Sequence, residues 1–430
     1  MRRGAYLRQL DIDLERWASL GLIDPADVDV LRAQAGPAAR QYSLSGMLFM
    51  LGVILIACAI MIFIGANWQA LPRLLRLGIL LALMWGAYGG AFALLRRGRA
   101  VFAEGALLIG AVLFGAAIML VGQMYHINAG WPNGVLLWAC GSFLTAAVVP
   151  SRACAVLAML LFSIWSGGIS FSHDWVMHWP FLAALAAMIV LARALDFRPL
   201  AHLIVLSFIA WSFANALVLA DDLHDGEFPY FVTLMMTLAL AMWLGGLGAT
   251  KLGAKFGGLV AGYGVFFLTG IVFLLQFAED DAVSGNITAV LIYVCGGLVA
   301  ALALAASALR AIKPIDALIA AGLIGAALVS CTLGDDWPHG LNYLFAGIDL
   351  AFVAWLVSYG LRTHRTFAVN LAFVAFGAEV LYLYFVVFGT MLQQSALFAV
   401  GGVLFLIAAF VLERVRREVV KPGREGAFKP

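Results

Sequence analysis

Two acidic residues in apolar surroundings are the strongest candidates for chemistry in this sequence. Asp349 lies in the segment FAGIDL and Glu379 in the segment FGAEV. An ionisable side chain inside a bilayer is costly, so each one indicates a partner or a function. On consecutive antiparallel helices, both would lie about 12 Å from the same membrane surface, given a rise of roughly 1.5 Å per residue.

At equal depth the carboxyl groups of Asp349 and Glu379 could face each other, and neither has a Lys or Arg at membrane depth that could neutralise it. Two carboxylates in a low-dielectric site cannot both ionise cheaply, so we expect one to be protonated at neutral pH. Such a pair could carry a proton or share a cation. The alternative is two separately hydrogen-bonded, protonated carboxyl groups that hold helices together.

A second polar group is expected at the outer membrane surface. It consists of Asn67, Arg73 and Arg76 after the first apolar segment, and Gln123, Tyr125 and His126 after the third. These side chains could bind an anionic small molecule or a lipid head group through charge and hydrogen bonds. The alternative is anchoring at the interface, with Trp68 among the head groups and the arginines snorkelling.

The same region resembles the bacterial membrane proteins of domain-of-unknown-function family 2157, over about residues 10 to 150. The matching features are Gly21-Leu22-Ile23, Asn67-Trp68 at the end of the first apolar segment, and the Gln123-x-Tyr125-His126 turn before the segment that contains Trp138. That family has no assigned activity. The resemblance therefore implies a membrane protein and no catalytic role for any residue.

Metal and enzyme chemistry have weaker support in the sequence. Five histidines fall on the predicted outer side: His126, His173, His178, His224 and His339. No compact ligand spacing accompanies them, so we expect no metal site. His202 and Ser207 are the best pair for an intramembrane enzyme, but polar pairs one turn apart are common by chance.

Cofactors and nucleic acid are not expected partners either. The five cysteines lie in apolar segments without paired spacing, which favours small hydrophobic residues over a disulfide or zinc site. No phosphate-binding glycine motif follows a strand. We also expect Glu104, near the start of the third span, to pair with Arg97 or Arg99.

Composition indicates the elements that position these residues. Of the 430 residues, 64% are hydrophobic and 12% are charged, against about 25% charged in soluble domains. A spanning helix needs roughly 20 apolar residues, and the predicted spans are 45–65, 74–95, 104–121, 134–149, 153–171, 179–192, 201–220, 230–247, 257–277, 287–309, 315–333, 343–360, 366–388 and 397–412. The sequence therefore predicts an all-α, polytopic membrane bundle of about fourteen transmembrane helices within residues 42–412.

Orientation follows from the basic residues, since Lys and Arg in short loops mark the cytoplasmic side. With the N-terminus inside, all 26 Lys and Arg residues except Arg73 and Arg76 fall in inner segments, while outer loops are acidic. No signal peptide precedes the first span. We expect a protein of the bacterial inner membrane with both termini, including a basic tail at 413–430, in the cytoplasm.

Residues 1–41 are predicted to form a cytosolic helical hairpin. Leu7, Leu10, Leu14 and Trp17 recur at helical spacing, Gly21 ends the first helix, and Asp24 caps the second. So small a unit buries little core alone. It could pack on the membrane domain, on the bilayer or on a protein partner, or simply be solvated.

The function suggested by these features is a proton- or cation-coupled transporter or flippase, using Asp349 and Glu379. The alternative is a non-transporting scaffold or sensor that acts through its cytosolic hairpin. Under that alternative, both carboxyl groups could be replaced by neutral amides with little loss of function. An intramembrane enzyme ranks last.

Overall fold

The computed structural model describes residues 72–126, 130–172, 177–222, 227–277, 292–333 and 341–387 without a break, with parts of 10–62 and residues 290 and 406. Every regular element in these ranges is helical. The chain divides into two compact units, residues 1–165 and 166–430. The predicted domain boundaries near residues 41 and 413 fall outside the described ranges and stay predictions.

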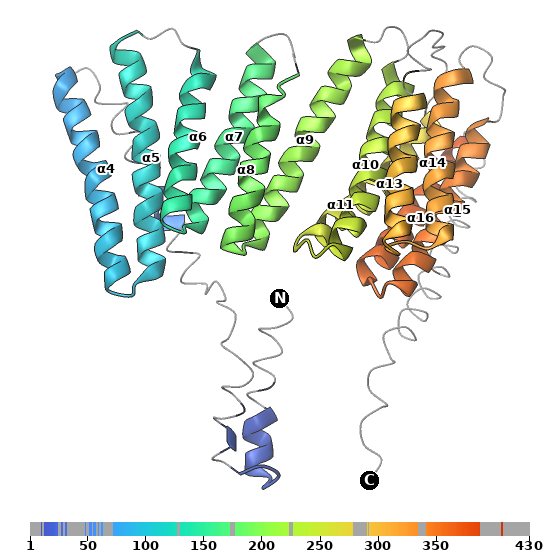
Figure 1. The fold of residues 1–430 in the computed structure, drawn as a ribbon, viewed down its shortest axis with the longest axis horizontal. Helices are drawn as coiled ribbons and strands as arrows, with labels where there is room; N and C mark the ends of the chain where they lie inside the picture. Colours follow the sequence, from blue (N-terminus) through green and yellow to red (C-terminus); the bar gives the residue numbers. More distant parts are fainter. Residues whose placement is uncertain are drawn as a thin grey trace. The chain divides into compact units, whose positions relative to one another are not determined.

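The first unit contains α4 (Arg73–Arg96), α5 (Ala100–Met124), α6 (Trp131–Val148) and most of α7 (Arg152–Ser172). Its helices α4, α5 and α6 lie side by side and alternate in direction (Figure 1). Glycines let aromatic rings approach α5 and α6 closely. A Cβ at Gly115 would lie 2.2 Å from the ring of Trp138, whose Nε1 donates a 2.8 Å hydrogen bond to the Ala111 carbonyl.

The second unit runs from the end of α7 to α16. Its helices are α8 (Pro180–Leu195), α9 (Arg198–Asp222), α10 (Glu227–Lys251), α11 (Gly257–Leu274), the 3₁₀ turn η1 (Leu275–Phe277), the π turn η2 (Ile292–Gly296), α13 (Gly297–Ala308), α14 (Pro314–Leu333), α15 (Leu341–Arg362) and α16 (Thr366–Val387). Helix α10 is the centre of this unit, because it packs against α9, α11, α13 and α14. Its Tyr230 and Trp243 side chains are fully buried.

Glycines set the approach of α10 and α11. A Cβ at Gly264 would lie 2.4 Å from the Trp243 backbone nitrogen, and one at Gly246 would lie 2.5 Å from that of Ala261. No side chain fits at either position, so the two backbones touch. Small residues at a membrane helix interface allow this kind of contact.

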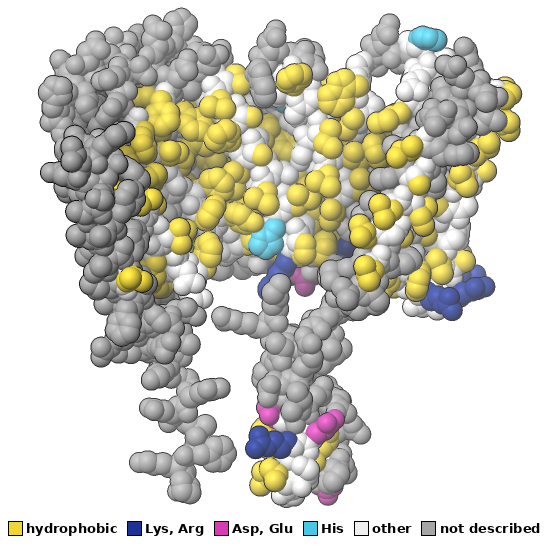
Figure 2. All heavy atoms as spheres, turned by 180° about the vertical axis from the view of Figure 1, so that it is seen from behind, with side chains coloured by type: hydrophobic (Ala, Val, Ile, Leu, Met, Phe, Trp, Pro, Cys, Tyr) yellow, Lys and Arg dark blue, Asp and Glu magenta, His cyan; other side chains and the backbone are white. Residues whose placement is uncertain are grey.

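The basic residues gather at one set of helix ends. The connections after α10, α13 and α15 carry Lys or Arg, and the connection after α8 is flanked by Arg193 and Arg198. Each of the four contains a residue with left-handed backbone: Asp196, Gly253, Arg310 and His364. Because successive helices alternate in direction (Figure 1), these turns lie at the same end of the second unit. In the space-filling view (Figure 2), hydrophobic side chains cover the sides of the membrane helices, and the Lys and Arg side chains visible on these helices lie at their ends.

The membrane fold predicted from the sequence is confirmed. Within the ranges described above, nine helices are long and apolar enough to cross a bilayer, and α8 and the 293–308 segment are shorter apolar helices. Each predicted span between 74 and 388 coincides with an observed helix to within a few residues. The chain is therefore an all-α, multi-pass membrane protein whose helices contact lipid. The first and last predicted spans fall largely or wholly outside the described residues.

The N-terminal hairpin is described in part. Residues 13–19 are helical, and Gly21, with φ 69°, ends this helix as predicted. Residues 27–28 are helical again, and the Asp27 amide donates to the Asp24 carbonyl at 2.9 Å. Leu14 and Val28 are buried, whereas Trp17, Leu20 and Leu22 are 40%, 62% and 69% exposed.

Candidate functional site

Asp349 and Glu379 lie on neighbouring helices at matching heights. Asp349 is eight residues after the start of α15 and Glu379 is eight residues before the end of α16. Because the two helices are antiparallel and packed together, both side chains lie about 12 Å from the same helix ends, given a rise of roughly 1.5 Å per residue. The carboxyl groups interact with each other electrostatically.

Both acids are withdrawn from solvent and lipid. The Asp349 side chain is 1% exposed and that of Glu379 is 0% exposed. No donor group of another described residue reaches either oxygen of Asp349 or Oε1 of Glu379, and the two carboxyl groups lie close enough to share a hydrogen bond when one of them is protonated. Neither side chain forms an ion pair with any Lys or Arg that the structure describes.

A third polar residue, Gln276, completes the group and was not predicted from the sequence. Its Nε2 donates a 2.6 Å hydrogen bond to Oε2 of Glu379 and a 3.3 Å one to the Phe273 carbonyl. The side chain is 1% exposed, and its Oε1 has no partner in the described part of the chain. We call Gln276, Asp349 and Glu379 the acid cluster.

Local backbone and aromatic packing position Gln276. Helix α11 tightens at its end into the 3₁₀ turn η1, which packs against α15. Phe273, Phe277 and Tyr382 form a three-ring group with centroid distances of 5.0–5.8 Å. Tyr382 lies one helical turn beyond Glu379, so this group covers the acid cluster toward the C-terminal ends of α11 and α16.

The atoms of the acid cluster that could bind a proton or a cation are all oxygens. Two carboxyl groups and one amide carbonyl can share protons or surround a hard cation, which prefers oxygen ligands. A low-dielectric site makes a second negative charge expensive, so a proton or a cation would balance the pair. No group of three or more His, Cys, Asp or Glu side chains with metal-site geometry occurs among the described residues.

The predicted outer polar group lies at the ends of α4 and α5. Helix α4 begins at Arg73, which places Arg76 in its first turn beside the end of the antiparallel α5. Gln123 is in the last turn of α5, and Tyr125 follows as its C-cap. Tyr125 is 63% exposed, and His126 adopts a left-handed backbone with φ 50°. Asn67 lies outside the described residues.

Glu104 anchors the next connection and departs from the predicted pairing with arginine. Its carboxylate accepts hydrogen bonds from the Ser151 hydroxyl at 2.7 Å and from the amides of Arg152 and Ala153 at 3.2 and 3.1 Å. These amides open α7, so Glu104 acts as the N-terminal cap of that helix. A carboxylate is preferred there because free amides and the helix dipole both favour negative charge.

Residues 15–155 match the family described as predicted membrane protein, DUF2157. The match confirms the resemblance over this segment, which contains the helix-ending turn at Tyr125 and His126 and the Trp138 helix. Neither a curated protein nor a solved structure matches the chain. The acid cluster lies beyond the DUF2157 segment, so its role must be argued from its own geometry.

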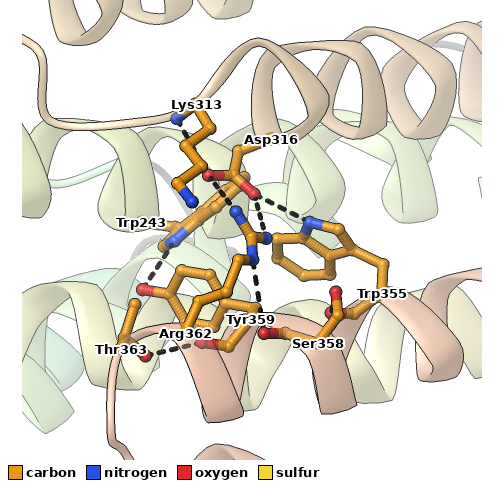
Figure 3. Close-up of polar contacts among 8 residues, drawn as sticks. All are labelled: Trp243, Lys313, Asp316, Trp355, Ser358, Tyr359, Arg362 and Thr363. Atoms are coloured by element: carbon orange, nitrogen blue, oxygen red, sulfur yellow. Dashed lines mark hydrogen bonds and ion pairs between the residues drawn. The ribbon is translucent and has the colours of Figure 1, made fainter.

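A second buried polar group lies at the basic end of the unit that follows the DUF2157 segment (Figure 3). Asp316, 3% exposed, accepts from Trp355 Nε1 at 2.9 Å, from Arg362 at 2.7 Å and from the Lys313 amide at 3.0 Å. Trp243, from α10, packs edge-on against Trp355 and Tyr359. Asp316 thus caps α14 and joins it to α15. This group was not predicted from the sequence. The signal for it is an acidic residue, Asp316, at the start of one apolar segment and a basic residue, Arg362, at the end of the next.

Two of the described histidines, His178 and His202, have side-chain hydrogen-bond partners. Nδ1 of His178 lies 3.2 Å from the Ser166 hydroxyl, and burial lowers the pKa of this imidazole. Nδ1 of His202 lies 3.0 Å from the Tyr263 hydroxyl, which gives it a partner on α11. His173, His224 and His339 lie outside the described residues.

Proposed function

We propose that the protein is a membrane carrier, either a transporter or a flippase, coupled to the movement of a proton or a cation through Asp349 and Glu379. The supporting observation is the burial of two interacting carboxyl groups whose oxygens are largely without hydrogen-bond partners in the described structure. A purely structural acid would normally have its acceptors filled, because an unsatisfied buried polar atom costs about 1–3 kcal/mol. Retention of several such atoms at one place favours exchange with a mobile ion.

Gln276 supports the same proposal. Its amide donates to one oxygen of Glu379 and leaves a carbonyl available beside both acids. The donor holds Glu379 in place, and the carboxyl group of Asp349 faces it and can share a proton or a cation with it. In this arrangement Gln276 positions the site, and the two carboxyl groups exchange the proton or cation.

The test uses purified protein in liposomes that contain a pH-sensitive dye. An imposed ion gradient and a panel of solutes are applied to the wild type, to an Asp349→Asn/Glu379→Gln variant and to an Asp196→Asn control. Asp196 is an exposed acid outside the acid cluster. We expect gradient-dependent proton or cation flux in the wild type and the control, and its loss in the double variant. Equal flux in all three would overturn the assignment.

We further propose that the protein resides in the bacterial inner membrane with both termini in the cytoplasm. The basic turns at one end of the second unit support this orientation through the positive-inside rule. In a cysteine-free background, Cys at position 251 should react with a membrane-impermeant maleimide only after cell lysis. Cys at position 125 should react in intact spheroplasts, and the reverse pattern would contradict the orientation.

A second candidate function, a scaffold or sensor, is favoured by one observation on the hairpin. Trp17, Leu20 and Leu22 expose large apolar surfaces close together in sequence, as in a site for a protein partner. A Leu20→Ser/Leu22→Ser variant should then lose the protein's function in cells while keeping the thermal stability of the wild type. Under this reading, the Asp349→Asn/Glu379→Gln variant keeps full function in cells.

A further inference from the structure

An apolar groove of about 420 Å³ opens between α8, α9, α10 and α11. Ile204, Val205 and Phe208 of α9 form one wall, and Leu238 and Met242 of α10 form the other. All of these side chains are apolar. The groove is therefore suited to a hydrocarbon chain rather than to a polar solute.

Small residues give the groove its depth. Its lining includes Ala192, Ala201, Ala241 and Gly245. A Cβ built at Gly245 would meet no heavy atom within 4 Å, in contrast to the neighbouring Gly246, which is packed against α11. Position 245 therefore accepts a Cβ without a clash, and the atoms of a larger side chain beyond it would take up volume in the groove.

One end of the groove is positively charged. Arg193 and Lys255 line it there, and so does Gly257, the first residue of α11. The Gly257 amide already donates to the Ala254 carbonyl at 3.2 Å, so α11 contributes here through its N-terminal dipole, which favours an anion. Lys255 Nζ lies 3.2 Å from Asp196, but both side chains are more than half exposed, so this pair is weak and readily exchanged.

The length of the groove matches one leaflet of a bilayer. Phe208 lies ten residues beyond Arg198 at the start of α9, and Leu238 lies thirteen residues before Lys251 at the end of α10. At roughly 1.5 Å per residue, the apolar walls extend about 15–20 Å from the basic end. Half of the hydrocarbon core is about 15 Å thick.

We propose that this groove binds one anionic phospholipid. An acyl chain lies between α9 and α10, and the phosphate lies against Arg193, Lys255 and the N-terminus of α11. The charge complementarity excludes a neutral head group as the preferred occupant, since basic pockets between membrane helices select anionic lipids. The apolar length excludes a free phosphate ion. This site is separate from the acid cluster and does not depend on the carrier proposal.

The experiment is native mass spectrometry of the purified full-length protein in detergent, titrated with dioleoyl phosphatidylglycerol or dioleoyl phosphatidylcholine. Two lipids with identical chains separate the head-group contribution from the chain contribution. The variants are Arg193→Gln/Lys255→Gln for the charge and Gly245→Leu for the groove. Lys251→Gln and Gly270→Leu are matched controls, because Lys251 and Gly270 are exposed, do not line the groove, and Gly270 also has open space before it.

We expect the wild type and both controls to prefer phosphatidylglycerol. Removing two basic residues should reduce this preference by about 25-fold, at about fivefold for each. Gly245→Leu should weaken the binding of both lipids to the same extent. The proposal fails if the wild type binds the two lipids equally, if the controls lose binding as the groove variants do, or if inorganic phosphate displaces the lipid.

Discussion

The amide of Gln276 donates a 2.6 Å hydrogen bond to the carboxyl group of Glu379, linking the end of α11 to α16 across 103 residues of sequence. Both side chains are buried. The contact fixes the orientation of Glu379 relative to Asp349. Removing this hydrogen bond is therefore a direct way to alter the geometry of the acid cluster.

Replacing Gln276 with Leu should lower the free energy of unfolding by about 1–3 kcal/mol, because Glu379 loses its donor in a buried place. The additional change Glu379→Leu should recover part of the loss, since removing both partners is less costly than removing one. Unfolding in mixed micelles with increasing SDS measures the free energy of unfolding of both variants. Equal losses in the single and double variants would argue against a direct coupling.

Asp316 should be among the most sensitive acids in the chain. Asp316→Ala leaves Arg362 and the Trp355 indole without their acceptor, and breaking a buried ion pair in this way costs about 3–5 kcal/mol. Asp196→Ala, in an exposed pair, should cost at most about 1 kcal/mol. The same SDS titration compares them, and similar losses would show that the burial of Asp316 is not decisive.

Gly264→Ala should disrupt the α10–α11 contact. The new Cβ would lie 2.4 Å from the Trp243 nitrogen, which is backbone and cannot rotate away, so we expect a loss of about 1–3 kcal/mol. Gly262→Ala, two residues earlier, has open space. It should be neutral or stabilise by up to about 1 kcal/mol. Melting temperatures of the purified variants give their order of stability relative to the wild type.

Glu104→Ala should destabilise the DUF2157 segment by about 1–3 kcal/mol through loss of the α7 cap. Glu104→Gln retains an acceptor and should cost less. Arg97→Gln and Arg99→Gln should leave stability nearly unchanged, because the carboxylate binds the α7 amides. A larger effect of the arginine variants would restore the ion-pair prediction.

His178 should contribute a pH dependence with a defined sign. Burial lowers the pKa of its imidazole below the ordinary 6.5. The unfolded chain therefore binds this proton more readily than the folded chain, and stability falls as pH drops from about 6.5 toward the folded pKa. The drop in melting temperature between pH 7.5 and pH 5.5 should be smaller in His178→Gln than in the wild type. An unchanged drop would remove His178 as a contributor.

The sequence by itself determined the membrane fold and the positions of the helices. Apolar length is a local property, so a span such as 74–95 could be assigned without knowledge of its neighbours and appears as α4. The placement of Asp349 and Glu379 at equal height also followed from counting along two consecutive helices. Gly21 as a helix stop followed from backbone freedom at a single residue.

The tertiary structure alone decided which distant residues meet. Gln276 reaches Glu379 because η1 packs against α15 and α11 against α16. Glu104 caps α7 instead of pairing with an arginine because α5 and the start of α7 come together. The lipid groove depends on Gly245 facing open space while Gly246 faces α11. Such choices depend on side-chain shape and on the close approach of whole helices, neither of which hydropathy or charge spacing encodes.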